Sequence, residues 1–244
     1  MSDKTRIYGK VVEINTKQVK DFYNERAKAL KDSLSTVNLQ TDSEASKKRD
    51  SHEKEHIIPK LELNLNEKVF EFGCGFGRFA EALRGNIGSY LGVDISDELI
   101  ALAKTKFAEN ANFQFIEGDT GSLAENPHLI GVGYSLLMTM GVSTYLNDDE
   151  VKALYGLFCK ISAPNARIYI RESVALIPER LTLNGFWSDN LQQKYTAIYR
   201  TIPEYEALLK IFNDNGFKLE ESGFAYPSVP ENAETTQFYF ILKR

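Results

Sequence analysis

The amino-acid sequence predicts an α/β fold in which a helical extension precedes a doubly wound, mostly parallel sheet that carries an antiparallel strand near its C-terminal end. Strand-like and helix-like patterns alternate from residue 67 to residue 174, which indicates a parallel sheet with helices on both faces. Residues 217–224 and 235–242 then read as two strands with no room for a helix between them. Two strands joined in this way form an antiparallel hairpin.

The first sixty residues precede the sheet and have a helical pattern. Val19, Phe22 and Leu30 recur at helical spacing, and a second helix is expected within residues 44–63. A polar stretch separates the two segments. We therefore expect residues 1–64 to form a helical extension.

The most informative segment is residues 69–80, where an apolar strand runs through a glycine loop into a helix. Gly73, Gly75 and Gly77 let the backbone turn sharply and come close to a ligand, because glycine has no Cβ. A dinucleotide-binding loop has its third glycine three residues after the second, where this chain has Arg78. The spacing therefore disfavours nicotinamide-dependent hydride transfer.

Acidic residues follow the ends of the first three sheet strands. Glu71 precedes the glycine loop, Asp94 ends the strand that begins at residue 90, and Asp119 follows the strand that begins at residue 113. The carboxyl ends of parallel strands meet at one edge of a sheet, where ligands bind. The three carboxylates are therefore expected to converge on one ligand.

Two helices in the second half of the chain have clear N-terminal signals. Asn147 with Glu150 three residues later forms one capping pair, and Thr201 with Glu204 forms another. The second helix is expected to end near Gly216.

Together these segments resemble the class I S-adenosylmethionine-dependent methyltransferases of the small-molecule type. The glycine loop is similar to the family's first motif, and residues 134–146 look like its fourth strand and the loop after it. The resemblance implies a seven-stranded sheet and S-adenosylmethionine as cofactor, with Asp94 on the ribose hydroxyls and Asp119 near the adenine. The cofactor-binding residues that we expect are Glu71, Gly73, Cys74, Gly75, Gly77, Asp94, Ile95, Asp119, Thr120 and Met138.

The resemblance also implies different roles for two segments of the chain. Residues 1–64 would fold over the cofactor cleft as a lid, and residues 65–244 would form the cofactor-binding domain, with an acceptor-binding insertion around 175–202. Tyr23 and Arg26 are polar groups on the otherwise apolar face of the first helix, which favours the lid. The alternative is a pair of helices that cover a sheet edge.

The acceptor site is less clearly marked than the cofactor site. Methyl transfer from a sulfonium is a direct displacement, which positioning can accelerate without a base. The residues that we assign to catalysis are His52, His56, Tyr23 and Arg200. The residues that we assign to binding an anionic or sugar-like acceptor are Arg26, Arg171, Tyr195 and Tyr199. Solvated histidines on a charged helix, and a tyrosine face on a helix at 195–199, are the structural alternatives.

Composition restricts the class of protein. The 244 residues suffice for one domain with a full core, and the net charge of −5 without a long basic stripe disfavours nucleic acid as a partner. A signal peptide and an apolar run of about eighteen residues are both missing, so we expect a cytoplasmic protein, monomeric or homodimeric, without a membrane partner. The cysteines, Cys74 and Cys159, are expected to be free thiols, and no metal site is expected.

The sequence thus predicts methylation of an oxygen on a small polar or anionic metabolite, such as a sugar, a nucleotide-linked intermediate or a carboxylate, in a natural-product or surface-polysaccharide pathway. The Asn/Asp-Pro-Pro-Tyr/Phe motif of enzymes that methylate DNA or glutamine does not follow the strand at 134–140. Ser135 stands where the family usually has Asp. Alternatives are an N-methyltransferase that acts on an amine or a protein N-terminus, a non-catalytic cofactor-binding protein and, more distantly, a dehydrogenase.

Overall fold

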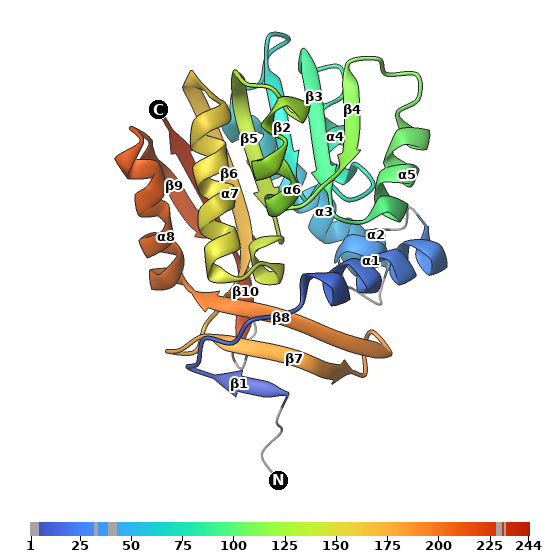
Figure 1. Cartoon of the computed structure of the whole chain (residues 1–244), viewed down its shortest axis with the longest axis vertical. Helices are drawn as coiled ribbons and strands as arrows, with labels where there is room; N and C mark the ends of the chain where they lie inside the picture. The colour runs from blue at the N-terminus through green and yellow to red at the C-terminus, as the bar shows by residue number, and fades with distance from the viewer. Residues whose placement is uncertain (1–4, 32–33, 39–42, 228–230, 232) are drawn as a thin grey trace.

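The main sheet is mostly parallel with an antiparallel strand near the C-terminal end, as the sequence predicts. The computed structural model describes residues 5–31, 34–38, 43–227, 231 and 233–244. The strands of the main sheet lie in the spatial order β4-β3-β2-β5-β6-β10-β9 (Figure 1). They are β2 (Lys68–Phe72), β3 (Ser89–Asp94), β4 (Phe113–Glu117), β5 (Tyr134–Met140), β6 (Ser162–Ala175), β9 (Lys218–Phe224) and β10 (Thr235–Lys243).

Strand direction confirms the doubly wound sheet. Strands β2 to β6 pair in parallel, whereas β10 runs antiparallel to both β6 and β9. The predicted hairpin of 217–224 and 235–242 is therefore present as β9 and β10. Because β10 is inverted, its N-terminal residues lie at the edge where the parallel strands end.

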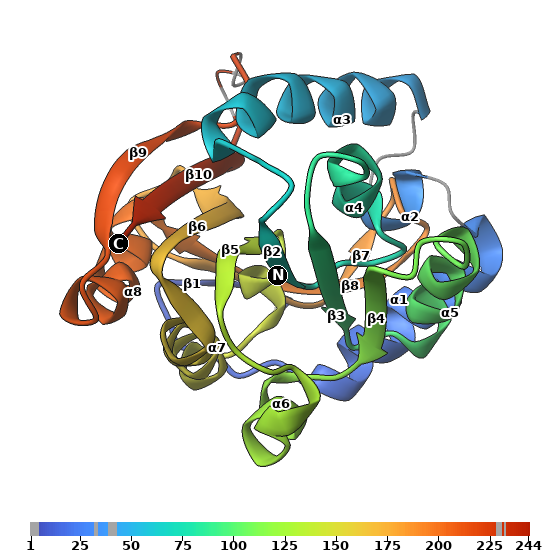
Figure 2. The same cartoon turned by 90° about the horizontal axis from the view of Figure 1, so that it is seen from above.

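Helices cover both faces of the main sheet (Figure 2). On one face, α6 (Thr120–Glu125), α7 (Asp148–Ile161) and α8 (Ile202–Asp214) contribute to a core cluster with the strands. On the other face, α3 (Ser43–Ile57), α4 (Arg78–Leu83) and α5 (Asp97–Lys106) pack with η1 (Ile58–Leu61). Short 3-10 turns η2 (Pro127–Leu129) and η3 (Ser143–Tyr145) follow α6 and β5.

The local helix signals are confirmed by the capping contacts. Asn147 and Glu150 form a capping box at the start of α7, and Thr201 and Glu204 form one at the start of α8. Ser96 Oγ accepts a hydrogen bond from the Leu99 amide at 3.1 Å and caps α5. Satisfied N-terminal amides of this kind stabilise a helix by about 1 kcal/mol each.

A second group of strands lies below the main sheet (Figure 1). It comprises β1 (Arg6–Tyr8), β7 (Leu181–Ser188) and β8 (Gln193–Thr201), and it joins the main sheet through the pairing of β8 with the end of β6. The alternative of a helix face at 195–199 is therefore wrong. Tyr195 and Tyr199 point to the same side because residues four apart on a strand share a face.

The N-terminal extension is not purely helical, because β1 belongs to the second group of strands. Helix α3 covers a face of the main sheet, while α1 (Thr16–Leu30) lies between the two groups of strands (Figure 1). In α1, Val19 and Phe22 pack with β7 and β8, and Ala27 packs with Leu99 of α5. Arg26 donates to the carbonyls of residues 35 and 36, which ties α2 (Leu34–Asn38) to α1. Part of the polar stretch expected between the two helices lies outside the described residues.

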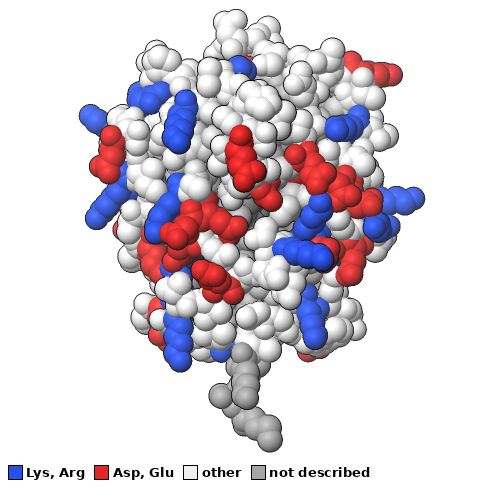
Figure 3. All heavy atoms as spheres, viewed as in Figure 1, with Lys and Arg blue, Asp and Glu red and all other residues white. Residues whose placement is uncertain are grey.

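The outer surface mixes charges of both signs. On the face shown in Figure 3, acidic and basic side chains alternate over the helices. Among the described residues, no helix combines the length and the apolar character that crossing a membrane requires.

Candidate cofactor and acceptor site

The glycine loop lies at the carboxyl edge of the sheet and touches the loop that follows β5. Gly73 has φ +80°, and a Cβ on it would lie 2.0 Å from Cγ2 of Val142. Glycine is therefore required at this position for two reasons, conformation and space. The close approach makes these two loops into one continuous wall.

Asp94 is held rigidly at the end of β3. Its Oδ2 accepts the Gly75 amide at 2.8 Å and its Oδ1 accepts the Ser96 amide at 2.9 Å. Burial raises the pKa of Asp94, while these amides oppose the increase. The carboxylate is thus fixed in position before any ligand binds.

The other two predicted acids also have partners within the fold. Asp119 Oδ1 accepts the Ser122 amide at 2.7 Å and caps α6, so its capping role is observed. Glu71 accepts the hydroxyl of Tyr90 at 2.5 Å, and burial raises the pKa of Glu71 to about 7.

A small cavity of about 100 Å³ lies over the ends of β2, β3 and β4. Predicted cofactor residues that line it are Gly73, Gly75, Asp94, Ile95, Asp119 and Thr120. Apolar side chains complete its wall, among them Phe72 and Leu99. The cavity therefore combines acidic acceptors with apolar surface.

A larger cavity of about 900 Å³ adjoins the small one and opens between the main sheet and the second group of strands. Both cavities are lined by Tyr23, Val37, Gly73, Gly75, Met140, Gly141 and Tyr145, which marks the place where they meet. Predicted residues Glu71, Cys74, His52, Arg171, Tyr195 and Tyr199 line the larger cavity only.

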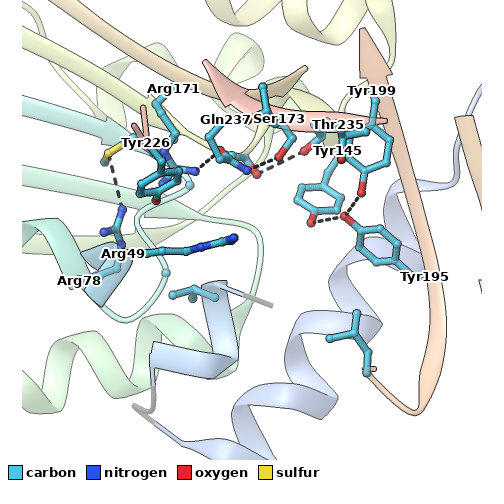
Figure 4. Close-up of a pocket in the computed structure, with 18 of the residues that line it drawn as sticks. Arg49, Arg78, Tyr145, Arg171, Ser173, Tyr195, Tyr199, Tyr226, Thr235 and Gln237 are labelled. Atoms are coloured by element: carbon cyan, nitrogen blue, oxygen red, sulfur yellow. Dashed lines mark hydrogen bonds between the residues drawn. The ribbon is translucent and has the colours of Figure 1, made fainter. Parts of the chain in front are cut away.

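Four phenols, which we call the tyrosine cluster, line one side of the larger cavity: Tyr145 and Tyr195 are buried, and Tyr23 and Tyr199 are half-buried. Figure 4 shows Tyr145, Tyr195 and Tyr199 together. The Tyr145 and Tyr195 hydroxyl oxygens lie 3.0 Å apart, and the Tyr199 hydroxyl donates to Tyr195 at 3.1 Å. The Tyr23 ring packs edge-on against Tyr145 with a centroid distance of 5.4 Å. Burial raises the pKa of all four phenols. They therefore stay protonated near neutral pH and can donate hydrogen bonds.

The opposite side of the cavity is built on buried ion pairs with α3. Glu53 binds Arg171 Nε at 2.9 Å and Arg78 Nη2 at 2.9 Å, and Asp50 binds Arg78 Nη1 at 2.7 Å. Burial alone would raise the pKa of Glu53, but the two guanidinium groups outweigh it and lower the pKa to about 2. Helix α3 is thus fixed to the sheet by charge as well as by packing.

Comparisons with known proteins agree with this architecture. A family profile described as a methyltransferase domain matches residues 69–165. The structure of phosphoethanolamine N-methyltransferase 1 from Haemonchus contortus, in complex with phosphoethanolamine and S-adenosylhomocysteine, gives a TM-score of 0.72 at 19% identity, covering 93% of this chain and 48% of that chain. The structure of magnesium protoporphyrin IX methyltransferase from Synechocystis PCC 6803 with bound S-adenosylmethionine gives a TM-score of 0.63 at 15% identity. The match covers 96% of this chain and 99% of that chain. Residues 69–165 therefore match a methyltransferase domain, and the whole chain has the fold of these methyltransferase structures.

The matches to curated relatives cover only part of those proteins. Phosphoethanolamine N-methyltransferase 1 from Triticum aestivum is 27% identical over 164 residues, which cover 66% of this chain and 31% of the relative. Phosphoethanolamine N-methyltransferase from Plasmodium falciparum is 25% identical over 165 residues, covering 64% of this chain and 57% of the relative. The chain therefore spans less than a third of the first and just over half of the second.

Several residues predicted for the site lie away from the two cavities. Arg200 is fully buried, binds Asp148 at 2.6 Å and donates to the carbonyls of Ser143 and Leu146, so it supports the turn that carries Tyr145. Arg26 holds α2, as described above. His56 stacks on His52 at 3.9 Å but does not line either cavity.

Two predicted cofactor residues are also outside the cavity walls. Met138 is fully buried in the core of the sheet, and Met140, two residues later on β5, lines both cavities instead. Gly77 starts α4 and does not line either cavity. Residues two apart on a strand share a face, so only position along β5 separates the two side chains: Met138 lies in the interior of the sheet, whereas Met140 ends the strand next to the cavities.

Other lining residues were not predicted because they come from distant parts of the chain. Thr235 and Gln237 begin the inverted strand β10, whereas Tyr145 lies in the segment 134–146 that the resemblance marked, although it was not itself named as a site residue. Gln237 accepts from Arg171 Nη1 at 2.8 Å and connects the two sides of the cavity.

Glu172 is a further buried acid behind the site. One oxygen accepts the amides of Val142 at 3.3 Å and Ser143 at 3.1 Å, and burial raises the pKa of Glu172 to about 7. Its other oxygen, and the hydroxyls of Tyr155 and Tyr205, have no hydrogen-bond partner among the described residues. Glu172 therefore positions the loop that touches Gly73.

Proposed function

We propose that this methyltransferase binds S-adenosylmethionine across the two cavities and transfers its methyl group to a small anionic metabolite. The residues present fit the methyl donor. Asp94 and Asp119 supply acceptors for a ribose diol and an adenine edge, and Glu71 supplies a carboxylate for an ammonium group. When bound, the donor would supply a methyl group attached to a positively charged sulfur. The acceptor's nucleophilic atom would bond to the methyl carbon as the carbon–sulfur bond breaks, and the sulfur would leave as a neutral thioether.

The excess of basic side chains in the larger cavity supports the proposal that the acceptor is anionic. Among its described lining residues, Lys48, Arg49, Arg78 and Arg171 are cations, and Glu71 is the only acid. The tyrosine cluster adds neutral hydrogen-bond donors. An acceptor with a phosphate or carboxylate group would find charge-assisted partners here, whereas a simple cationic amine would not.

We place the methyl transfer at the junction of the cavities and propose oxygen as the acceptor atom. Tyr23 and Tyr145 lie at the junction and stay protonated, so they can orient an acceptor but not remove its proton. An anionic oxygen needs no base, and holding it in line can supply most of the acceleration. His52 remains the candidate base for a hydroxyl acceptor.

A second candidate is the amine nitrogen of a phosphorylated acceptor. The curated relatives are named for methylation of phosphoethanolamine, which combines an anionic group with an amine. The aromatic rings of the tyrosine cluster would also stabilise a cation close to the junction. In both cases we propose that the N-terminal residues 1–64 cover the site, with α1 as the part next to the ligands.

Calorimetry with S-adenosylhomocysteine, followed by a methyl-transfer assay over carboxylates, sugar phosphates and phosphorylated amines, tests the proposal. We expect binding by the wild type and about tenfold or greater weakening in Asp94→Ala, since a hydrogen bond to a charged group contributes about 1.5–3 kcal/mol. An exposed acid on α8 that lines neither cavity offers a control in Asp214→Ala. Unchanged affinity in Asp94→Ala would remove Asp94 from the cofactor site, and binding without any turnover would favour a non-catalytic protein.

A further inference from the structure

We propose that Lys48 and Arg49 bind a phosphate monoester at the far end of the methyl acceptor, on the side of the larger cavity opposite the tyrosine cluster. The proposal rests on the proposed function and names its substrate class. Both side chains line the cavity, and both are exposed at its rim on α3.

The other lysines of α3 already have carboxylate partners. Lys47 lies 3.0 Å from Glu44, and Lys54 lies 2.7 Å from Asp50. In the part of the chain that the structure describes, Lys48 and Arg49 form no ion pair. These two adjacent cations thus face the cavity without a compensating charge.

The nearby acids of α3, Asp50 and Glu53, do not neutralise Lys48 and Arg49. The carboxylates of Asp50 and Glu53 are shared among Arg78, Arg171 and Lys54, so three cations already use two acids. This side of the cavity therefore has an excess of positive charge. An anionic ligand group would relieve the repulsion and gain charge-assisted hydrogen bonds.

Arg49 is oriented in a way that leaves its donors available. Its guanidinium lies over the Tyr226 ring, with 5.3 Å from Cζ to the ring centroid. Stacking uses the face of the guanidinium and leaves the N–H groups at its edge free for a bidentate contact. Figure 4 shows Arg49 reaching from the side of Arg78 and Tyr226 toward the middle of the cavity. Its donors therefore face the cavity.

Charge and location both favour an acceptor phosphate over the carboxylate of the methyl donor. A phosphate monoester carries about −1.5 to −2 charges near pH 7, which matches two cations, whereas the donor has a single carboxylate. Neither Lys48 nor Arg49 lines the small cavity with Asp94. The cations and the tyrosine cluster would hold the two ends of one acceptor.

Titration calorimetry with inorganic phosphate, on protein saturated with S-adenosylhomocysteine, tests this subsite. We expect phosphate to bind the wild type more tightly than acetate does. The double variant Lys48→Ala/Arg49→Ala should weaken phosphate binding by about a hundredfold, roughly tenfold for each lost charged contact. Arg49→Lys, which keeps the charge but loses the planar fork, should fall between. Lys47→Ala is the matched control and should behave as the wild type.

Two results would overturn the subsite, and neither is a failure of the proposed function. Equal phosphate affinity in the wild type and the double variant would show that phosphate binds elsewhere or not at all. A comparable loss of S-adenosylhomocysteine affinity in the double variant would assign the two cations to the cofactor's carboxylate. Failure of the proposed function has a separate signature, namely wild-type protein that does not bind S-adenosylhomocysteine.

Discussion

At the scale of single residues, the cofactor half of the site combines fixed and titratable carboxylates. Asp94 accepts two backbone amides and is fixed, whereas Glu71 accepts a neutral phenol and has a pKa raised to about 7. The difference matters because a carboxylate with a pKa near 7 exists partly in its neutral form at physiological pH. Only its ionised form would attract the ammonium group of the methyl donor.

The affinity for the methyl donor should therefore depend on the ionisation of Glu71. Below pH 7 the acid is protonated in the free protein, and binding an ammonium group requires loss of that proton. We expect the affinity for S-adenosylhomocysteine to fall by up to tenfold for each pH unit below 7 and to level off above it. Calorimetry from pH 5.5 to 8.5 measures this directly. Glu71→Gln should bind more weakly and lose this dependence; a profile identical to that of the wild type would mean that another group titrates.

Glu172 acts at a distance from the ligands, through the loop after β5. Replacement by alanine removes the acceptor of two buried amides and should weaken S-adenosylhomocysteine binding by about tenfold, because an unsatisfied buried donor costs about 1–3 kcal/mol. Glu172→Gln keeps a carbonyl for the amides and adds donors next to the unpartnered phenols of Tyr155 and Tyr205. It should bind as the wild type does. Equal losses in both variants would argue against positioning by hydrogen bonds.

At the scale of secondary-structure elements, the N-terminal extension divides into two kinds of helix. Helix α3 is fixed by Glu53, which is 1% exposed and binds two guanidinium groups from the sheet side. Helix α1 is attached near its exposed face through Lys20 to Glu117 and through Asn24 to Asp97. Exposed ion pairs of this kind contribute little to stability. We therefore assign the moving part of the proposed lid to α1 and α2.

Loss of the Glu53 carboxylate should destabilise the fold. Glu53→Ala leaves Arg171 and Arg78 short of a partner in a buried site, which costs about 3–5 kcal/mol. Because the pKa of Glu53 is lowered to about 2, its stabilising contribution is present above the unfolded value near 4.3 and is lost as the pH falls toward 2. Urea unfolding at pH 7 and at pH 3 measures both effects. Glu55→Ala, at an exposed position on the same helix, should have the stability of the wild type; equal stability of the two variants would mean that α3 does not depend on the ion pairs.

The elements that the sequence predicts well are those defined by neighbouring residues. The caps of α7 and α8 lie within three residues of each other, and the strand, glycine loop and helix at 69–80 are continuous in sequence. Strands β7 and β8 form a local hairpin that was not predicted, whereas the pairing of β7 with β1 joins residues about 175 apart and has no local signal. For the same reason the pairing of Glu53 with Arg171, 118 residues apart, has no local signal.

At the scale of the whole molecule, the two cavities are lined by elements that are far apart in the sequence. Six of the ten residues predicted to bind the cofactor line the small cavity, because they follow strand ends within one continuous stretch of sequence. The acceptor half collects Tyr145 after β5, Tyr195 from β8, Arg49 from α3 and Gln237 from β10, and only the assembled fold brings them together. Arg200 shows the limit of composition arguments, because a buried arginine that supports a turn has the same sequence signature as one that binds a ligand.

Ligand binding should couple these parts and be measurable as stability. If S-adenosylhomocysteine binds only the folded protein, a concentration of 100 times its Kd raises the free energy of unfolding by about 2.7 kcal/mol. Thermal unfolding with and without the ligand measures the increase. In hydrogen exchange, α1 and α2 should gain protection because they border the cavity through Tyr23 and Val37, whereas α8, on the far face, should not. A rise in melting temperature without added protection at residues 16–38 would mean that α1 is a fixed wall. The cleft would then exchange ligands on the opposite side, next to Tyr226 and the start of β10.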